Sequence, residues 1–196
     1  QQETIEQSAM AEIKDALEAY AEENGSLPSN ANWVSELAPY ASLSEGAIEL
    51  DQWDQARSYH KITEVVNFRA TNISVDYGAV YSEGIERGVG ETGVNVDLPA
   101  LLGDSSDYAT LQAEYGDYLV KYTNYKQQVK NYEITEQRLK DISSALASYA
   151  TTRFNEAVVA GTPNAEQFIY YPPTDDADLG SADAANYSNF ALDDVD

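Results

Sequence analysis

The first 28 residues constrain the fold most, because they describe an amphipathic helix with a defined end. Between residue 2 and about residue 24, apolar side chains recur at three- and four-residue steps. Asn24 and Gly25 then offer the left-handed backbone in which many helices end, and Pro28 cannot continue a helix. We therefore expect the helix to end at Asn24 and Gly25. The chain then turns at Pro28 and enters a globular head. The side chains expected to hold this helix to the head are Ile5, Ile13, Leu17 and Tyr20.

A small antiparallel sheet is expected beneath this helix. Residues 58–68 and 71–81 are rich in β-branched and aromatic side chains and are separated by a short polar turn around Arg69. A short helix with Trp33, Val34 and Leu37 directed inward is predicted before them. In the second strand, alternation predicts Ile73, Val75, Tyr77 and Ala79 toward the core and Asn72, Ser74 and Asp76 toward water. The glycine-rich segment 84–93 is expected to be a loop.

A second helical region is predicted from about Asp107 to Ala160, as one long helix or a helical hairpin. Apolar side chains keep heptad spacing there, and many of them are tyrosines. We expect this stripe to be a buried seam, with an adhesive surface or a groove for a partner helix as the alternatives. The fold class is therefore α+β. Its predicted parts are a helix-plus-sheet head (1–100), a Tyr-rich helical segment (101–160) and an irregular acidic region packed on or trailing from the head (161–196).

Composition excludes several functions. The chain has 34 acidic against 11 basic residues, a formal charge of −23, which disfavours nucleic acid because phosphate binding depends on Lys and Arg. No cysteine is present, so disulfides, thiol catalysis and Cys-based zinc sites are excluded. There is a single histidine, His60, and no phosphate-binding glycine loop, so we predict no enzyme activity. No apolar run reaches the roughly 18 residues that a membrane helix needs.

Two charged groups of residues are candidates for binding. Near the C-terminus, four carboxylates could supply oxygen ligands to Ca²⁺, although a solvated acidic tail is the simpler interpretation: Asp175, Asp176, Asp178 and Asp183. No other cofactor is expected. Basic residues gather between residues 121 and 140, opposite in sign to the rest of the chain, and could attract an acidic surface of a neighbouring subunit. The candidate interface comprises Lys121, Lys126 and Lys130 with Tyr118 and Tyr125.

The segment from Glu12 to Pro28 resembles the region of type IV pilins and type II secretion pseudopilins in which the long N-terminal helix ends. The matching residues, in order, are Tyr20, Asn24, Gly25, Leu27 and Pro28. Farther on, the run Leu50-Asp51-Gln52-Trp53-Asp54 resembles the Asp-Pro-Trp-Gly element of that family, carried here by Asp51 and Trp53. Gln52 replaces the proline and Asp54 replaces the glycine, and the disulfide of the larger pilins cannot form. The resemblance covers roughly the first 80 residues.

This resemblance implies a structural subunit, major or minor, of an extracellular or periplasm-spanning filament or secretion system. Its partners would be other pilin-like subunits and the assembly machinery. It also implies an apolar helical half before Gln1 that anchors the subunit in the inner membrane before assembly, and a periplasmic or extracellular location. Secretion pseudopilins carry a calcium loop near their C-terminus, to which residues 179–183 are faintly similar.

Two alternatives belong to other classes of protein. A surface adhesin or carbohydrate-binding module would use Tyr and Trp rings as stacking platforms, with Trp33 and Trp53 as the test residues. A hydrolase would need desolvated carboxylates in a pocket, and no motif for one is present.

Overall fold

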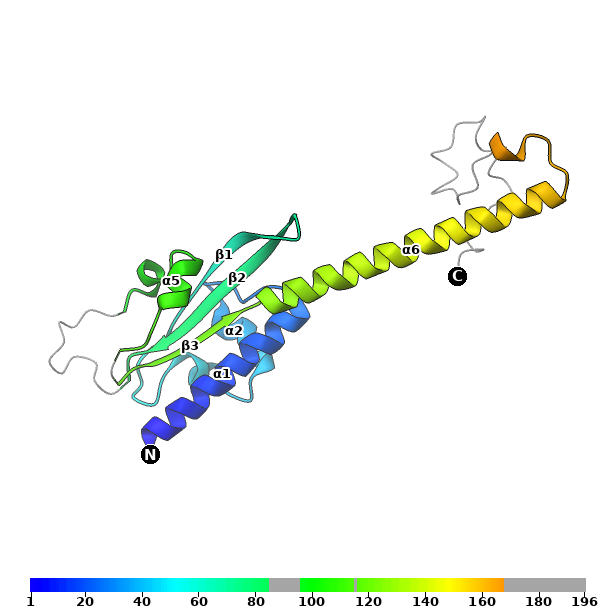
Figure 1. The fold of residues 1–196 in the computed structure, drawn as a ribbon. Helices are drawn as coiled ribbons and strands as arrows, with labels where there is room; N and C mark the ends of the chain where they lie inside the picture. The colour runs from blue at the N-terminus through cyan, green and yellow to red at the C-terminus, as the bar shows by residue number, and fades with distance from the viewer. Residues whose placement is uncertain (85–95, 115, 168–196) are drawn as a thin grey trace. The chain divides into compact units, whose positions relative to one another are not determined.

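The computed structural model describes residues 1–84, 96–114 and 116–167, and its contacts divide the chain into two units, 1–131 and 132–196. Most of the glycine-rich segment 84–93 lies outside the described residues, as do the four candidate calcium ligands Asp175, Asp176, Asp178 and Asp183. The first unit contains the sheet and the helices around it, which are the elements that position the candidate site (Figure 1).

The N-terminal helix α1 spans Gln2–Asn24 and ends as predicted. Gly25 has a left-handed backbone with φ 71°, and its amide donates a hydrogen bond to the carbonyl of Ala21 at 2.9 Å. Ile13 and Leu17 are fully buried, and Tyr20 packs at the edge of the same core. Ile5 is the exception: it is 47% exposed, so it does not hold the helix to the head.

Three antiparallel strands form the sheet, in the order β1, β2, β3. They are β1 Ser58–Phe68, β2 Thr71–Ser82 and β3 Tyr118–Thr123. Arg69 and Ala70 have positive φ angles of 49° and 63°, which give the tight turn that a two-residue hairpin needs. The predicted hairpin is therefore confirmed, with Thr63 opposite Asp76 and Val80 opposite Val120 in the register.

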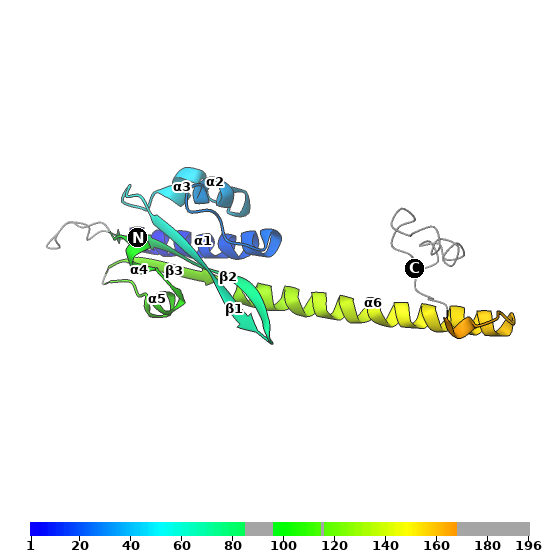
Figure 2. The same ribbon diagram turned by 90° about the horizontal axis from the view of Figure 1, so that it is seen from above.

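Both faces of the sheet are covered (Figure 2). One face packs on α1 and on the short helices α2 Trp33–Leu37, η1 Ala38–Tyr40 and α3 Glu45–Glu49. The other face packs on α4 Leu98–Leu101 and α5 Ser105–Thr110, where Leu98 and Leu102 contact the core around Ala79 and Tyr81. From Val75 onward the central strand β2 is thus enclosed on both sides, and Asp76, predicted to face water, is only 4% exposed.

The predicted Tyr-rich helix is wrong over residues 118–123, which form β3 instead. Gly116, with φ 91°, precedes the strand, and residues 118–123, four of which are β-branched or aromatic, pair with the second half of β2. Tyr118, Val120 and Tyr122 then share the face covered by α1, because alternate strand residues point the same way. Residues 101–131 therefore belong to the same unit as the head.

The long helix α6 spans Tyr125–Val159, beginning 18 residues later than predicted. The heptad stripe is not a buried seam, since α6 contains no buried residue and Leu139 is 62% exposed. Residues 125–131 belong to the first unit and the rest of the helix to the second, which also contains the short helix η3 Ala165–Gln167. Among the described residues, no helix has the length and apolarity required to cross a membrane.

Candidate functional site

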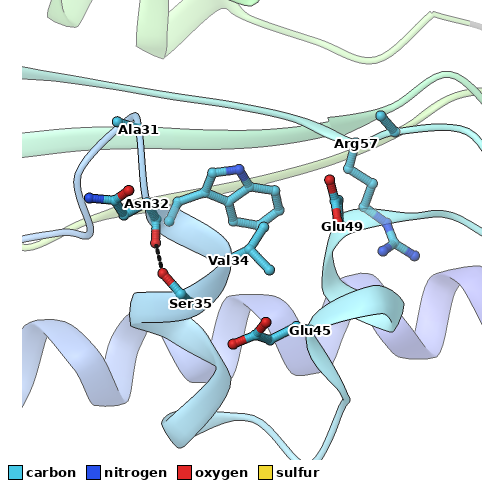
Figure 3. A pocket seen from close by; sticks show the side chains of 9 residues that line it. Ala31, Asn32, Val34, Ser35, Glu45, Glu49 and Arg57 are labelled. Atoms are coloured by element: carbon cyan, nitrogen blue, oxygen red, sulfur yellow. Dashed lines mark hydrogen bonds between the residues drawn. The ribbon is translucent and has the colours of Figure 1, made fainter.

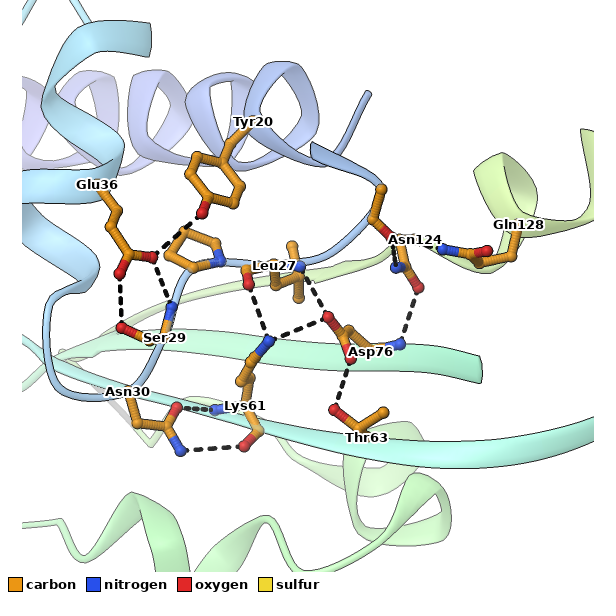
Figure 4. A network of polar contacts seen from close by, with 12 residues as sticks. Tyr20, Leu27, Ser29, Asn30, Glu36, Lys61, Thr63, Asp76, Asn124 and Gln128 are labelled. Carbon is orange, nitrogen blue, oxygen red and sulfur yellow. Dashed lines mark hydrogen bonds and ion pairs between the residues drawn. The ribbon is translucent and has the colours of Figure 1, made fainter. Parts of the chain in front are cut away.

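The loop that leaves α1 is attached to the sheet through the buried carboxylate of Asp76 (Figure 4). This carboxylate accepts hydrogen bonds from the Leu27 amide at 2.7 Å and from the Thr63 hydroxyl at 2.6 Å. Lys61 Nζ lies 3.1 Å from it as the ion-pair partner and also donates to the Leu27 carbonyl at 2.8 Å. A buried carboxylate is tolerated only with such partners, so Asp76 fixes the loop against β1 and β2.

Asn124 lies between β3 and α6 and joins the end of α1 to β2, the strand that carries Asp76. Its Oδ1 accepts a hydrogen bond from the Asp76 amide at 2.8 Å, and its Nδ2 donates to the Gly25 carbonyl at 3.0 Å. Gln128, in the first turn of α6, donates to the same Gly25 carbonyl. Carbonyls at a helix end need partners from outside the helix. These amides therefore connect three elements, α1, β2 and the start of α6, at one point.

Glu36 secures the next part of the loop. Its carboxylate accepts hydrogen bonds from the Ser29 hydroxyl at 2.7 Å, the Ser29 amide at 2.8 Å and the Tyr20 hydroxyl at 3.2 Å. The hydrogen bonds from Ser29 are the main reason that the pKa of Glu36 is lowered. Pro28 is held as well, because its carbonyl accepts a hydrogen bond from the Tyr59 hydroxyl at 2.9 Å. The whole helix exit, Asn24 to Ser29, is thus tied down by polar contacts.

A second attachment lies near the other end of α1, where Glu6 and Arg57 form a buried ion pair with both side chains 0% exposed. Arg57 Nε donates to one carboxylate oxygen at 2.8 Å and Nη2 to the other at 2.7 Å. The remaining nitrogen, Nη1, lies within 2.9 Å of three carbonyls that precede β1, those of Ala47, Ile48 and Leu50. This pair therefore anchors α1 to the chain between α3 and β1.

This ion pair is not among the contacts expected from the sequence, because its partners are 51 residues apart. One signal was available: Glu6 precedes Ile13 by seven residues and so lies on the apolar stripe of the helix. An acid in that stripe needs a buried cation, and Arg57 is only the second basic residue of the chain, after Lys14.

The Asp51 and Trp53 element forms a compact turn before β1. Asp51 is 5% exposed and accepts hydrogen bonds from the amides of Trp53 and Gln55 at 2.9 and 2.8 Å, and from the Ser82 hydroxyl at 3.1 Å. Asp54 has φ 59°, the left-handed conformation that glycine adopts most easily. The turn is therefore a structural support that joins the loop to the end of β2.

Both tryptophans are stacked within the fold. Trp53 lies against Tyr118 with 6.2 Å between ring centroids, and Trp33 lies against Tyr59 at 5.2 Å. Trp33 is 8% exposed and lines an open recess of about 360 Å³ between α2 and α3, together with Val34, Glu45 and Glu49 (Figure 3). Each tryptophan ring thus packs on another ring of the fold, and the recess beside Trp33 combines apolar and acidic walls.

The structure separates the residues predicted to form a basic interface. Lys121 is on β3, and its Nζ donates to the carbonyls of Tyr108 and Leu111 at 2.7 and 3.0 Å, so it is committed inside the fold. Tyr118 is on the same strand, stacked on Trp53, and Tyr125 begins α6. Lys126 and Lys130 are exposed one turn apart on α6. Neither of these two lysines has a hydrogen bond or ion pair within the described ranges. Of the five residues predicted for the interface, these two lysines remain as a candidate cationic surface.

No part of the described chain brings together three or more His, Cys, Asp or Glu side chains that could hold a metal ion. The candidate calcium ligands in the acidic C-terminal region lie outside the described residues, so calcium binding there stays a prediction. His60 lies on β1 with its Nδ1 3.2 Å from Nδ2 of Asn30, and partial burial lowers its pKa. It has no arrangement of catalytic partners among the contacts of the described chain.

No protein-family model, curated protein or solved structure matches this chain. The structure defines its class as α+β: an N-terminal helix on a three-stranded antiparallel sheet, and a long second helix. A fold of this class supports many functions, so the function must be argued from the attachments of α1 and from the charged surfaces.

Proposed function

We propose that this chain is a structural subunit, similar to a pilin or pseudopilin, of an extracellular or periplasm-spanning filament or secretion system. It acts by assembling with other pilin-like subunits and makes or breaks no covalent bond. The observation that carries the proposal is the double attachment of α1, through Glu6 and Arg57 near its start and through Asp76 and Asn124 at its exit.

This attachment suits a subunit that is held through its N-terminal helix. Force applied along α1 must pass to the head without the helix sliding over the sheet, and apolar packing alone resists sliding poorly because it is not directional. Hydrogen-bonded ion pairs and amides have fixed geometry and resist it better. Two polar attachments at opposite ends of the helix therefore transmit load between the helix and the head.

The resemblance to pilins adds support at two places. The exit from Asn24 to Pro28 has the left-handed cap and the tied-down loop that such a helix end requires. The turn at Asp54 has the backbone for which glycine, the residue of the family element, is best suited. The adhesin alternative receives less support, because Trp33 and Trp53 already use a ring face for stacking on Tyr59 and Tyr118.

Assembly is expected to use the exposed pair Lys126 and Lys130 against an acidic surface of a neighbouring copy. We expect the double reversal Lys126→Glu and Lys130→Glu to weaken self-association of the chain, measured by analytical ultracentrifugation at about 50 mM salt, where screening is modest. Each reversal is also measured alone beside Lys14→Glu, an exposed change on α1 that alters the net charge by the same amount and should have little effect. Unchanged association of the double variant would contradict this interface.

A further inference from the structure

We propose that the recess lined by Trp33, Val34, Glu45 and Glu49 is the acidic partner of the cationic surface, and that it receives Lys126 or Lys130 of a second copy of this chain. The inference rests on the proposed assembly function and names the surface that such assembly would use. It goes beyond the attachments of α1. Of the side chains that make those attachments, only Arg57 lines the recess.

The recess has a negative charge that the fold does not neutralise. Glu45 and Glu49 are exposed and lie one turn apart on α3, a spacing at which like charges repel. Neither carboxylate has a hydrogen bond or ion pair anywhere in the described ranges. Arg57 lines the same recess, but its guanidinium is fully engaged with Glu6 and three carbonyls. A cation from outside would therefore relieve a repulsion that is built into α3.

The other wall suits the stem of a lysine. Trp33 and Val34 supply apolar and aromatic surface, and Figure 3 shows the carboxylates of Glu45 and Glu49 across from the segment that carries Asn32 and Val34. A lysine packs its methylene groups on apolar surface while its ammonium group stays with acids or an aromatic ring. The volume of about 360 Å³ has room for such a side chain.

Charge and spacing favour a second copy as the source of the lysine. Lys126 and Lys130 are exposed, four residues apart on α6, and lack partners in the described chain. Glu45 and Glu49 are also four residues apart on a helix. Residues at this spacing have Cβ atoms about 5–6 Å apart, so the two pairs match in sign and in separation. One lysine would enter the recess while the other meets the second glutamate at its border.

A charge swap tests the pairing in the whole chain. Variant A carries Glu45→Lys and Glu49→Lys, and variant B carries Lys126→Glu and Lys130→Glu. We expect each alone to self-associate about fivefold more weakly than the unmodified chain, and an equimolar mixture to recover the association, because two exposed pairs contribute about 1 kcal/mol. The control, Asp15→Lys with Glu18→Lys, changes the net charge as much as variant A does, from exposed positions on α1. It should not weaken association or rescue variant B.

The control also separates specific pairing from bulk repulsion. If only the net charge of −23 mattered, variant A and the control would both associate more strongly than the unmodified chain. That outcome would overturn the proposal. So would a mixture of A and B that associates no better than either alone.

A peptide titration distinguishes failure of the recess from failure of assembly. The probe is a peptide of residues 121–135, added to the full chain while the indole N–H signals are followed by NMR, with Trp53→Phe identifying the Trp33 signal. We expect the Trp33 signal to shift, and the shift to be lost with Glu45→Gln and Glu49→Gln or with acetylated lysines in the peptide. If the chain does not self-associate but the peptide shifts Trp33 in this way, the recess is supported and the assembly function is not. Absence of the shift, or its persistence without the glutamates, would overturn the recess.

Discussion

At the scale of single residues, the buried charges are more informative than the apolar core. Glu6 and Arg57 lose their water entirely, and this cost is offset only because every charged atom has a partner. Asp76 is in a similar position between Leu27, Lys61 and Thr63. Local patterns cannot reveal such pairs, since alternation assigned Asp76 to water and its partners are distant in sequence. The sequence could indicate that an acid lies in an apolar stripe. It could not identify the cation that pairs with this acid.

Removing one partner of the Glu6–Arg57 ion pair should strongly lower the stability of the fold. We predict that Arg57→Ala lowers the free energy of unfolding by about 3–5 kcal/mol, because Glu6 stays buried without its cation and three carbonyls lose their donor. Replacing both partners, as Glu6→Leu with Arg57→Met, should recover the part of this loss that comes from the unpaired Glu6 carboxylate. Glu18→Ala, on the exposed side of α1, should change stability by less than about 0.5 kcal/mol in the same urea titration. A loss for Arg57→Ala no larger than that control would contradict the anchoring role of the pair.

The Glu36 carboxylate predicts how stability depends on pH. Hydrogen bonds from Ser29 lower its pKa in the folded chain from the ordinary value of 4.5. A group with a depressed folded pKa contributes stability above its unfolded pKa, and that contribution disappears as the pH falls through the folded pKa. Urea unfolding from pH 6 to pH 3 should therefore show a steeper loss for the unmodified chain than for Glu36→Gln or Ser29→Ala. Parallel curves for all three would show that the contact does not affect stability.

At the scale of elements, the sequence predicted those whose signals are local. The hairpin of β1 and β2 was evident because two β-rich runs flank a two-residue turn, and α1 because its periodicity ends at Gly25. The strand β3 was missed because its tyrosines fall at spacings that also fit a heptad, and only pairing with β2 decides between the two. The β-branched and aromatic residues that follow Gly116 were the signal that favoured a strand: Tyr118, Val120, Tyr122 and Thr123. The core around Leu98 and Leu102 depends on a long-range contact in the same way.

The end of α1 permits a matched test of backbone conformation. Gly25 has a left-handed φ of 71°, whereas Gly46 lies inside α3, and an added Cβ would meet nothing within 4 Å at either site. Gly25→Ala should therefore cost about 1–2 kcal/mol in unfolding free energy through backbone strain alone. Gly46→Ala should add about 0.5–1 kcal/mol, because alanine favours the helix. Calorimetric melting of both variants decides the matter, and shifts of the same sign would contradict the assigned end of the helix.

At the scale of the whole molecule, the net charge limits which surfaces of two copies can come into contact. A chain with a formal charge of −23 repels its own copies unless its few exposed cations face acids. The structure leaves Lys126 and Lys130 in the solvent and commits Lys61, Lys121 and Arg57 to contacts inside the fold. It also attaches α1 to the head at both ends. The proposed assembly rests on these two features: the attachment of α1 at both ends, and the exposed lysines available for charge contacts with another copy.

The coding sequence immediately upstream of Gln1 tests the pilin-like function most directly. A pilin-like subunit requires a short leader, a cleavage site similar to Gly-Phe/Met-Thr-Leu-Ile-Glu, and then about 20 apolar residues, the length of a membrane-spanning helix. Those residues would continue α1 in the same helical phase. An ordinary secretory signal peptide, or an upstream segment with no apolar run, would contradict the proposal that this chain is a pilin-like subunit.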